Sequence, residues 1–108
     1  MPEPSVRQAL EAMVADRDWE QFHTTENLIK SISIEAGELL ECVQWDIKAD
    51  PDLIRKELAD VLTYCHLLAA KLDLDPDQII LEKLQETKAK YPVEKALGRS
   101  TKYDRLQD

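Results

Sequence analysis

The stretch that decides the fold is residues 35–60, which read EAGELLECVQWDIKADPDLIRKELAD. Two acidic pairs, Glu35-x-x-Glu38 and Glu57-x-x-Asp60, are embedded there in apolar sequence of helical character. Residues three apart share one side of a helix, so each pair directs two carboxylates at one spot. Two such helices packed face to face would bring all four carboxylates together.

Such a cluster predicts a metal site. Negative charges near a core repel one another and lose hydration, at a cost of several kcal/mol per buried ion, which a divalent cation relieves. Because the ligands are all oxygens, Mg²⁺ is favoured, with Mn²⁺ as a substitute, over Zn²⁺. We expect four metal ligands: Glu35, Glu38, Glu57 and Asp60.

The flanking residues predict an antiparallel helical hairpin. Asp50-Pro51 joins an N-cap to a proline at the first helical position, which is a strong helix start. If the connection is centred near residue 49, Glu38 precedes it by 11 residues and Asp60 follows it by 11, so the pairs lie at similar heights. An apolar seam that requires a partner helix follows: Ile54, Leu58, Val61, Cys65, Leu68 and Leu72.

Two helices are expected before the hairpin turn and one after the hairpin. Ser5 is expected to cap a first helix that ends near Asp16, and Thr24 or Thr25 to cap the second. Asp75-Pro76 opens a fourth helix that should stop before Pro92. Its inward residues are expected to be Ile79, Ile80, Leu84 and Thr87.

The chain as a whole is predicted to be an all-α, four-helix bundle. It has only two glycines and no period-2 alternation. We expect residues 1–108 to form a single domain, with 93–108 as a polar tail that is either a disordered terminus or a basic segment closing over an anionic ligand. At 108 residues the core is near the lower size limit, so assembly as an oligomer is expected.

Composition limits the partners and the compartment. A net charge of -8 argues against nucleic acid or anionic membrane as partner, but not against a nucleotide that binds with metal. No apolar run approaches the roughly 20 residues of a membrane span, and no signal-peptide layout is seen, so a cytoplasmic protein is expected. Cys42 and Cys65 fall in apolar helical patterns, which favours reduced thiols.

The predicted cluster suits metal-assisted hydrolysis of a phosphate ester or anhydride. Glu41 is either a water-orienting base or an exposed helix residue. Four aromatic or imidazole side chains could stack a base or simply pack in the core: Trp19, His23, Trp45 and Tyr64. A ferritin-like di-metal site is disfavoured because Glu20-x-x-His23 alone fits its Glu-x-x-His pattern.

On these residues, the sequence resembles the MazG-like, all-α nucleoside triphosphate pyrophosphatases, and in particular their dCTP-pyrophosphatase-like branch. The resemblance covers nearly the whole chain. It rests on Arg17-Asp-Trp-Glu-Gln-Phe-His23, Ile34-Glu-Ala-Gly-Glu-Leu-Leu-Glu41 with Gln44-Trp45, Glu57-Leu-Ala-Asp-Val-Leu-x-Tyr64, Lys83-Leu84, Lys90-Tyr91-Pro92 and Ser100-x-Lys102-Tyr103.

The resemblance implies cleavage of a nucleoside triphosphate between the α- and β-phosphates. It also implies that Glu35, Glu38, Glu57 and Asp60 bind Mg²⁺, that Trp19, His23 and Trp45 line a base pocket, and that Tyr64 lies beside the metal. The triphosphate contacts that it implies are Lys83, Lys90, Tyr91, Arg99, Lys102 and Tyr103, the last three supplied either by the same chain or by a neighbouring subunit. A homotetramer built as a dimer of dimers is implied as well.

Two positions depart from the family pattern. Thr87 stands where an Asn is frequent, and Glu26 where a basic residue is frequent, so contact with phosphate or sugar is in question there. Two alternatives stay open: a non-catalytic helical module that binds a partner, and the same chemistry on a uridine or phosphoribosyl nucleotide.

Overall fold

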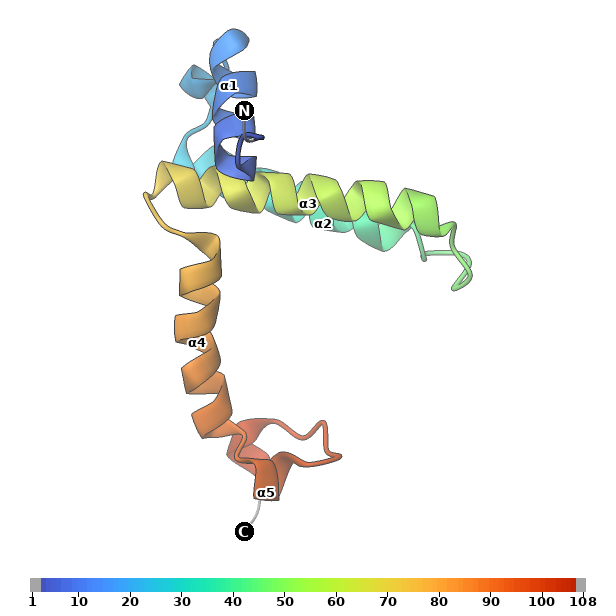
Figure 1. Cartoon of the computed structure of the whole chain (residues 1–108). Helices are drawn as coiled ribbons and strands as arrows, with labels where there is room; N and C mark the ends of the chain where they lie inside the picture. Colours follow the sequence, from blue (N-terminus) through green and yellow to red (C-terminus); the bar gives the residue numbers. More distant parts are fainter. Residues whose placement is uncertain (1–2, 107–108) are drawn as a thin grey trace. The chain divides into compact units, whose positions relative to one another are not determined.

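The computed structural model describes residues 3–106. All of its regular elements in that range are helices, which confirms the all-α prediction (Figure 1). The elements are α1 (Val6–Asp16), the 3₁₀ turn η1 (Glu20–Phe22), α2 (Thr25–Glu41), α3 (Pro51–Lys71), α4 (Pro76–Lys90), the short α5 (Val93–Ala96) and the 3₁₀ turn η2 (Tyr103–Arg105). None of the helices in this range is long and apolar enough to cross a membrane.

The predicted helix starts are confirmed, each by a side-chain cap. The Ser5 hydroxyl accepts a hydrogen bond from the Gln8 N–H at 3.2 Å, and the Thr24 hydroxyl accepts one at 3.1 Å in the first turn of α2. Asp50 and Asp75 cap α3 and α4, and in both helices a proline follows the cap. These oxygens satisfy N–H groups that have no partner inside a helix, which is why the boundaries follow from local sequence.

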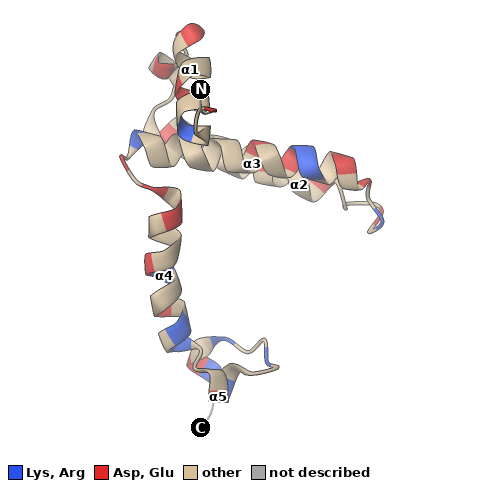
Figure 2. Ribbon diagram, viewed as in Figure 1, with Lys and Arg blue, Asp and Glu red and all other residues tan. Residues whose placement is uncertain are grey.

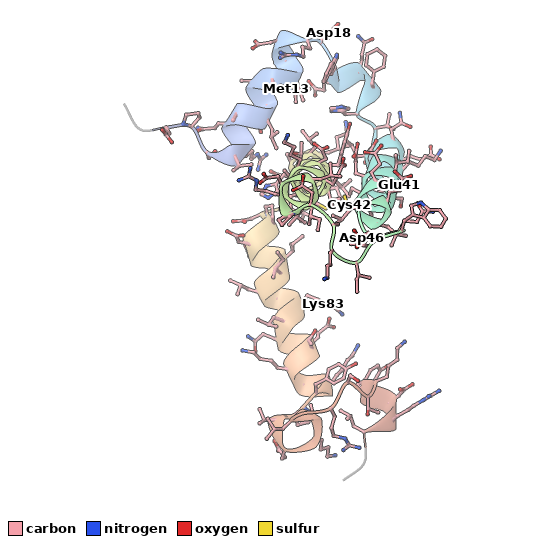
Figure 3. The ribbon with its side chains drawn as sticks, turned by 90° about the vertical axis from the view of Figure 1, so that its right-hand side faces the viewer. Met13, Asp18, Glu41, Cys42, Asp46 and Lys83 are labelled. Carbon is pink, nitrogen blue, oxygen red and sulfur yellow. The ribbon has the colours of Figure 1, made fainter. Side chains whose placement is uncertain are left out.

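The α2–α3 hairpin is the centre of the fold. The two helices run antiparallel and side by side, and α1 packs against α3 (Figure 1). The connection between them covers residues 42–50, because α2 ends at Glu41, and it leaves Val43 exposed. Cys42, next to Glu41 at that end of the hairpin, and Cys65 are both free thiols and half-buried (Figure 3).

The described chain divides between residues 74 and 75 into two compact units. The first unit contains α1, α2 and α3, and its buried core is Val14, Leu28 and Ala69, one residue from each helix. A core this small leaves much apolar surface in contact with water. The predicted seam on α3 is only partly covered: Ile54, Val61, Cys65 and Leu68 are half-buried, whereas Leu58 is 44% exposed and Leu72 is 47% exposed.

The second unit consists of α4 and the tail that folds onto its end. The rings of Tyr91 and Tyr103 meet edge to face with centroids 6.3 Å apart, and Lys90 Nζ lies 4.7 Å from the Tyr103 ring centroid. The tail of residues 93–106 therefore has its own contacts with the C-terminal end of α4.

The expectation that α4 turns its apolar residues inward is wrong for the single chain. Ile80 is 61% exposed, and Ile79 and Leu84 are 38% and 39% exposed. These residues line a groove along α4 together with Lys83 and Thr87. The apolar residues of α4 do lie on one side of the helix, as their spacing predicts. No other element in the described part of this unit covers them.

Replacing Asp73 by glycine should stabilise the first unit. Asp73 follows α3 with φ of 56°, a left-handed conformation that glycine adopts without a Cβ penalty. We expect a gain of about 0.5–1 kcal/mol in the free energy of unfolding, measured by urea denaturation. The lost contact with Arg7 is 3.6 Å long and its carboxylate is 94% exposed, so it contributes little.

Asp73→Ala is the matched control, because it removes the same carboxylate but keeps the Cβ atom. It should be no more stable than the parent chain. Equal stability of the Gly and Ala variants would contradict the assigned cause.

Candidate metal centre

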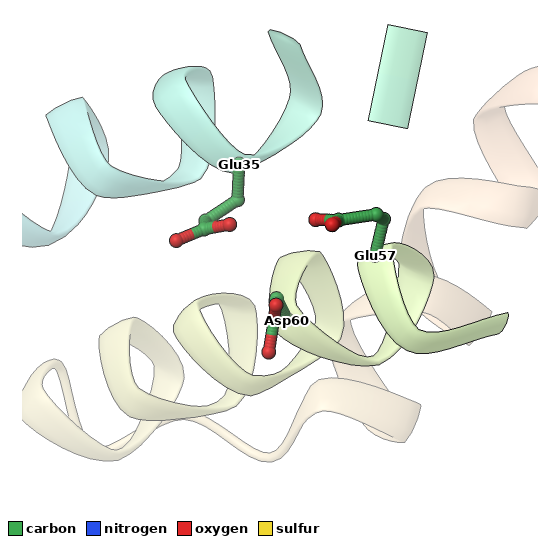
Figure 4. A group of neighbouring side chains, drawn as sticks. All are labelled: Glu35, Glu57 and Asp60. Carbon is green, nitrogen blue, oxygen red and sulfur yellow. The ribbon is translucent and has the colours of Figure 1, made fainter. Parts of the chain in front are cut away.

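Three carboxylates meet across the α2–α3 hairpin. Glu35 projects from α2 towards Glu57 and Asp60 on α3 (Figure 4). One oxygen from each of the three lies within 4.8 Å of the others. The antiparallel register that the sequence predicted therefore brings the two acidic pairs to the same height.

Ionised carboxylates are unfavourable in this cluster, because they are partly desolvated and close to one another. Glu35 Oε2 and Glu57 Oε2 are buried and have no hydrogen-bond partner within the described chain. The adjacent carboxyl of Glu38 is the main cause that raises the pKa of Glu35, and desolvation and the charges of Asp60 and Glu57 raise it further. Desolvation is the main cause that raises the pKa of Glu57, followed by the charges of Glu38 and Asp60.

The donor set fits a hard divalent cation. All the groups are carboxylates, and two of their buried oxygens lack a partner. No ion pair among residues 3–106 links any of these acids to a lysine or arginine. A cation bound between the helices would satisfy the buried oxygens and offset the repulsion.

Glu38 and Glu41 lie at the margin of the cluster. Glu38 is exposed and outside the group of three whose oxygens meet, but its carboxyl acts on both Glu35 and Glu57. Glu41, the last residue of α2, is exposed and its charge is the weakest of the causes that raise the pKa of Glu57. Its position is near the site and open to solvent.

The aromatic residues predicted for base binding do not meet within one chain. Trp19 precedes α2 and is 43% exposed, whereas Trp45 follows α2 and is 89% exposed. The 17 residues of α2 span about 26 Å at about 1.5 Å per residue, and the two tryptophans lie beyond its opposite ends. Tyr64 is half-buried, one turn beyond Asp60 on α3.

His23 lies at a separate feature of the first unit. It lines a cavity of about 350 Å³ whose apolar floor includes the fully buried Leu28, with Glu20 and Lys71 also on the wall. Sequence reasoning singled out His23 but not Lys71, because a lysine near the end of an amphipathic helix carries no motif that marks a cavity wall.

The predicted phosphate-contact residues all belong to the second unit, where some already have partners. Lys83 Nζ is 2.7 Å from Glu86, and the Thr87 hydroxyl donates to the Lys83 carbonyl at 3.3 Å. Arg99 donates to the carbonyl of Lys95 at 3.2 Å. Lys102 is exposed, and the group of Lys90, Tyr91 and Tyr103 is described above.

Glu26, the second departure from the family pattern, has a local role. It lies in the first turn of α2, where a negative charge is favourable, and its carboxylate is 3.2 Å from Lys30 one turn later.

Comparison with known proteins gives a consistent result. The MazG-like family matches residues 30–106, a range that contains both acidic pairs. The dCTP pyrophosphatases 1 of Rattus norvegicus and Homo sapiens are each 35% identical over 118 residues, which covers 97% of this chain and 69% of theirs. A pyrophosphatase from Archaeoglobus fulgidus superposes with a TM-score of 0.73 at 29% identity, over 85% of this chain and 98% of its own. The chain therefore belongs to the MazG-like family.

Proposed function

We propose that the protein is a metal-dependent nucleotide pyrophosphohydrolase that converts dCTP, or a deoxynucleoside triphosphate with a modified base, to the monophosphate and pyrophosphate. The observation that carries the proposal is the carboxylate cluster with two buried, unpartnered oxygens on Glu35 and Glu57. Its relatives, which are named dCTP pyrophosphatase 1 and pyrophosphatase, support this class of reaction.

In this proposal Glu35, Glu38, Glu57 and Asp60 hold Mg²⁺, for which Mn²⁺ can substitute. When bound, the metal polarises phosphoryl oxygens, offsets their charge and lowers the pKa of a coordinated water. Glu41, which is open to solvent one turn beyond Glu38, would accept the proton of the attacking water. Water adds to the α-phosphorus and pyrophosphate leaves, so the reaction needs no covalent intermediate.

We further propose that the substrate site is completed by a second copy of the chain. Trp19 and Trp45 are too far apart in one chain to enclose a single base, and the exposed seam on α3 provides a surface for association. The homotetramer suggested by the family resemblance fits this need. The basic tail would supply the triphosphate contacts: Lys90, Tyr91, Arg99, Lys102 and Tyr103. Lys83 and Thr87 are left out because their polar atoms are engaged within α4.

Mg²⁺ should stabilise the protein, and the metal-free protein should lose stability as pH rises. The pKa values of Glu35 and Glu57 are raised above the ordinary value of 4.5, so the folded state binds more protons than the unfolded state above that pH. Stability then falls as pH rises through the unfolded and folded pKa values. At neutral pH, a tenfold excess of Mg²⁺ over Kd should restore about 1.4 kcal/mol, measured as a shift in Tm.

Glu57→Gln is the test variant for this prediction. It should be more stable than the parent without metal at neutral pH, because a buried negative charge is removed, and it should lose most of the response to Mg²⁺. Glu26→Gln, a change of the same kind on the surface of α2, should keep the response. A parent protein with no Mg²⁺ response would refute the metal site.

Turnover should yield a nucleoside monophosphate and pyrophosphate, and Glu38→Gln should lower kcat by roughly 100-fold or more, because a metal ligand is lost. The measurement is product analysis on dCTP, dUTP, other triphosphates and a phosphoribosyl nucleotide, with and without Mg²⁺. Glu26→Gln again serves as the control. Release of orthophosphate would refute the cleavage position, and unchanged turnover in Glu38→Gln would refute its role.

A subunit-mixing experiment tests the shared site. Trp19→Ala and Trp45→Ala should each be nearly inactive alone, but refolding them together should recover about a quarter of the parent activity. The reason is that half of the two-copy assemblies are then mixed, and each mixed pair has one intact site of two. If the mixture stays as inactive as the two variants alone, each site is built from one chain.

A further inference from the structure

The connection between α1 and α2, residues 17–24, is held by hydrogen bonds rather than by burial. No residue of this connection is buried, and Trp19 and Phe22 are 43% and 59% exposed. Apolar contact therefore contributes little to its position. The connection carries His23, which lines the cavity of the first unit, so the bonds that hold the connection also hold this side chain.

The first half of the connection is bonded within itself and to the end of α1. The Trp19 N–H donates to the Val14 carbonyl at 3.0 Å. The side-chain amide of Gln21 donates to the carbonyl of Asp18 at 3.0 Å, and Asp18 has a left-handed φ of 52°. These bonds close the turn after α1 but do not reach α2.

The second half of the connection is tied to α2 by the side chain of Asn27. Its Nδ2 donates to the Phe22 carbonyl at 3.0 Å, and its backbone N–H donates to the Thr24 hydroxyl at 3.1 Å. The Phe22 carbonyl belongs to the peptide that leads into His23, and the Phe22 N–H donates to the Trp19 carbonyl at 2.9 Å. The Asn27 amide therefore fixes both ends of η1 to the first turn of α2.

The cavity beside His23 lies on the same side of the hairpin as the carboxylate cluster. Leu28 on its floor precedes Glu35 by seven residues on α2. Leu67 on its wall follows Asp60 by seven residues on α3. Seven residues fall within about 20° of two full turns and span about 10 Å. The connection therefore stands about two helical turns from the cluster, at one end of the site.

We propose that Asn27 is a positioning residue for the base end of the substrate. A nucleotide whose phosphates bind a metal at the cluster can reach the cavity with its base, since the two lie two helical turns apart. The Asn27 amide keeps His23 on the cavity wall and Trp19 at the start of η1. Asn27 itself neither lines the cavity nor belongs to the cluster. The inference rests on the proposed function for the nature of the ligand.

Asn27→Asp tests the proposal, because it removes the amide donor and keeps the size of the side chain. A negative charge in the first turn favours α2, so the variant should be at least as stable as the parent in urea. We expect KM for dCTP to rise about tenfold, with kcat within about twofold of the parent, because a hydrogen bond that pre-organises the site is lost. The inhibition constant of pyrophosphate, which has no base, should be unchanged.

The added charge needs a matched control. The connection and the first turn of α2 already carry acidic residues (red in Figure 2): Asp18, Glu20 and Glu26. A further negative charge there disfavours an anionic substrate. Lys30→Gln makes the start of α2 more negative by the same one unit and leaves the Asn27 amide bond in place. It should keep the parent KM.

Fluorescence tests the hold on η1 without any substrate. In a Trp45→Phe background, Trp19 is the one remaining tryptophan, and it is 43% exposed. Adding Asn27→Asp should raise the quenching of Trp19 by acrylamide, by about twofold at most, since full release of the ring would roughly double its exposure. Adding Lys30→Gln instead should leave the quenching unchanged.

The proposal is overturned if Asn27→Asp has the parent KM or the parent quenching, or if Lys30→Gln raises KM equally. Lower stability of Asn27→Asp in urea would assign Asn27 a structural role and also overturn it. A parent chain without turnover on any nucleotide refutes the proposed function instead. The quenching result then still decides whether Asn27 holds η1.

Discussion

Mutual repulsion of carboxylates held between two paired helices is the constraint on which the structure depends. The hairpin fixes Glu35 opposite Glu57 and Asp60 at short range, and two of their oxygens are withdrawn from water without a hydrogen-bond donor. The apolar surface of the first unit holds them there with a buried core of three residues. Such a small core contributes little free energy to offset unpaired charge, which favours the binding of a cation at the cluster.

The same small core explains why so much of the molecule faces outward. A unit with Val14, Leu28 and Ala69 as its buried residues cannot cover Leu58, Leu72 or Trp45. The exposed apolar residues belong to different elements: Leu58 and Leu72 to α3, Trp45 to the linker after α2, and Ile80 and Leu84 to α4. Exposed apolar surface on several elements suits a protein that associates with a partner.

Prediction from sequence was accurate where the determinants are local. The caps at Ser5, Thr24, Asp50 and Asp75 act within one turn of their own helix, so their positions can be read directly. The meeting of the two acidic pairs was predicted by counting the residues on either side of the hairpin turn. The prediction that the apolar residues of α4 point inward was wrong. The spacing of apolar residues shows that a helix has an apolar face, but not which surface covers that face. The aromatic enclosure was unpredictable for a similar reason: it requires knowing how far α2 carries Trp45 from Trp19.

The distribution of charge along the chain follows from the needs of an acidic metal site. Residues 88–105 have a net charge of +4, from six basic and two acidic residues, although the whole chain is at -8. A lysine or arginine bonded to Glu35 or Glu57 would neutralise the cluster and compete with a cation for the same oxygens. Within the first unit, the ion pairs of Arg7, Lys30 and Arg55 are with other acids, so the carboxylates of the cluster stay available. In the proposed function, a triphosphate brings a bound cation, which suits an acidic cluster, and free negative charge, which suits basic side chains.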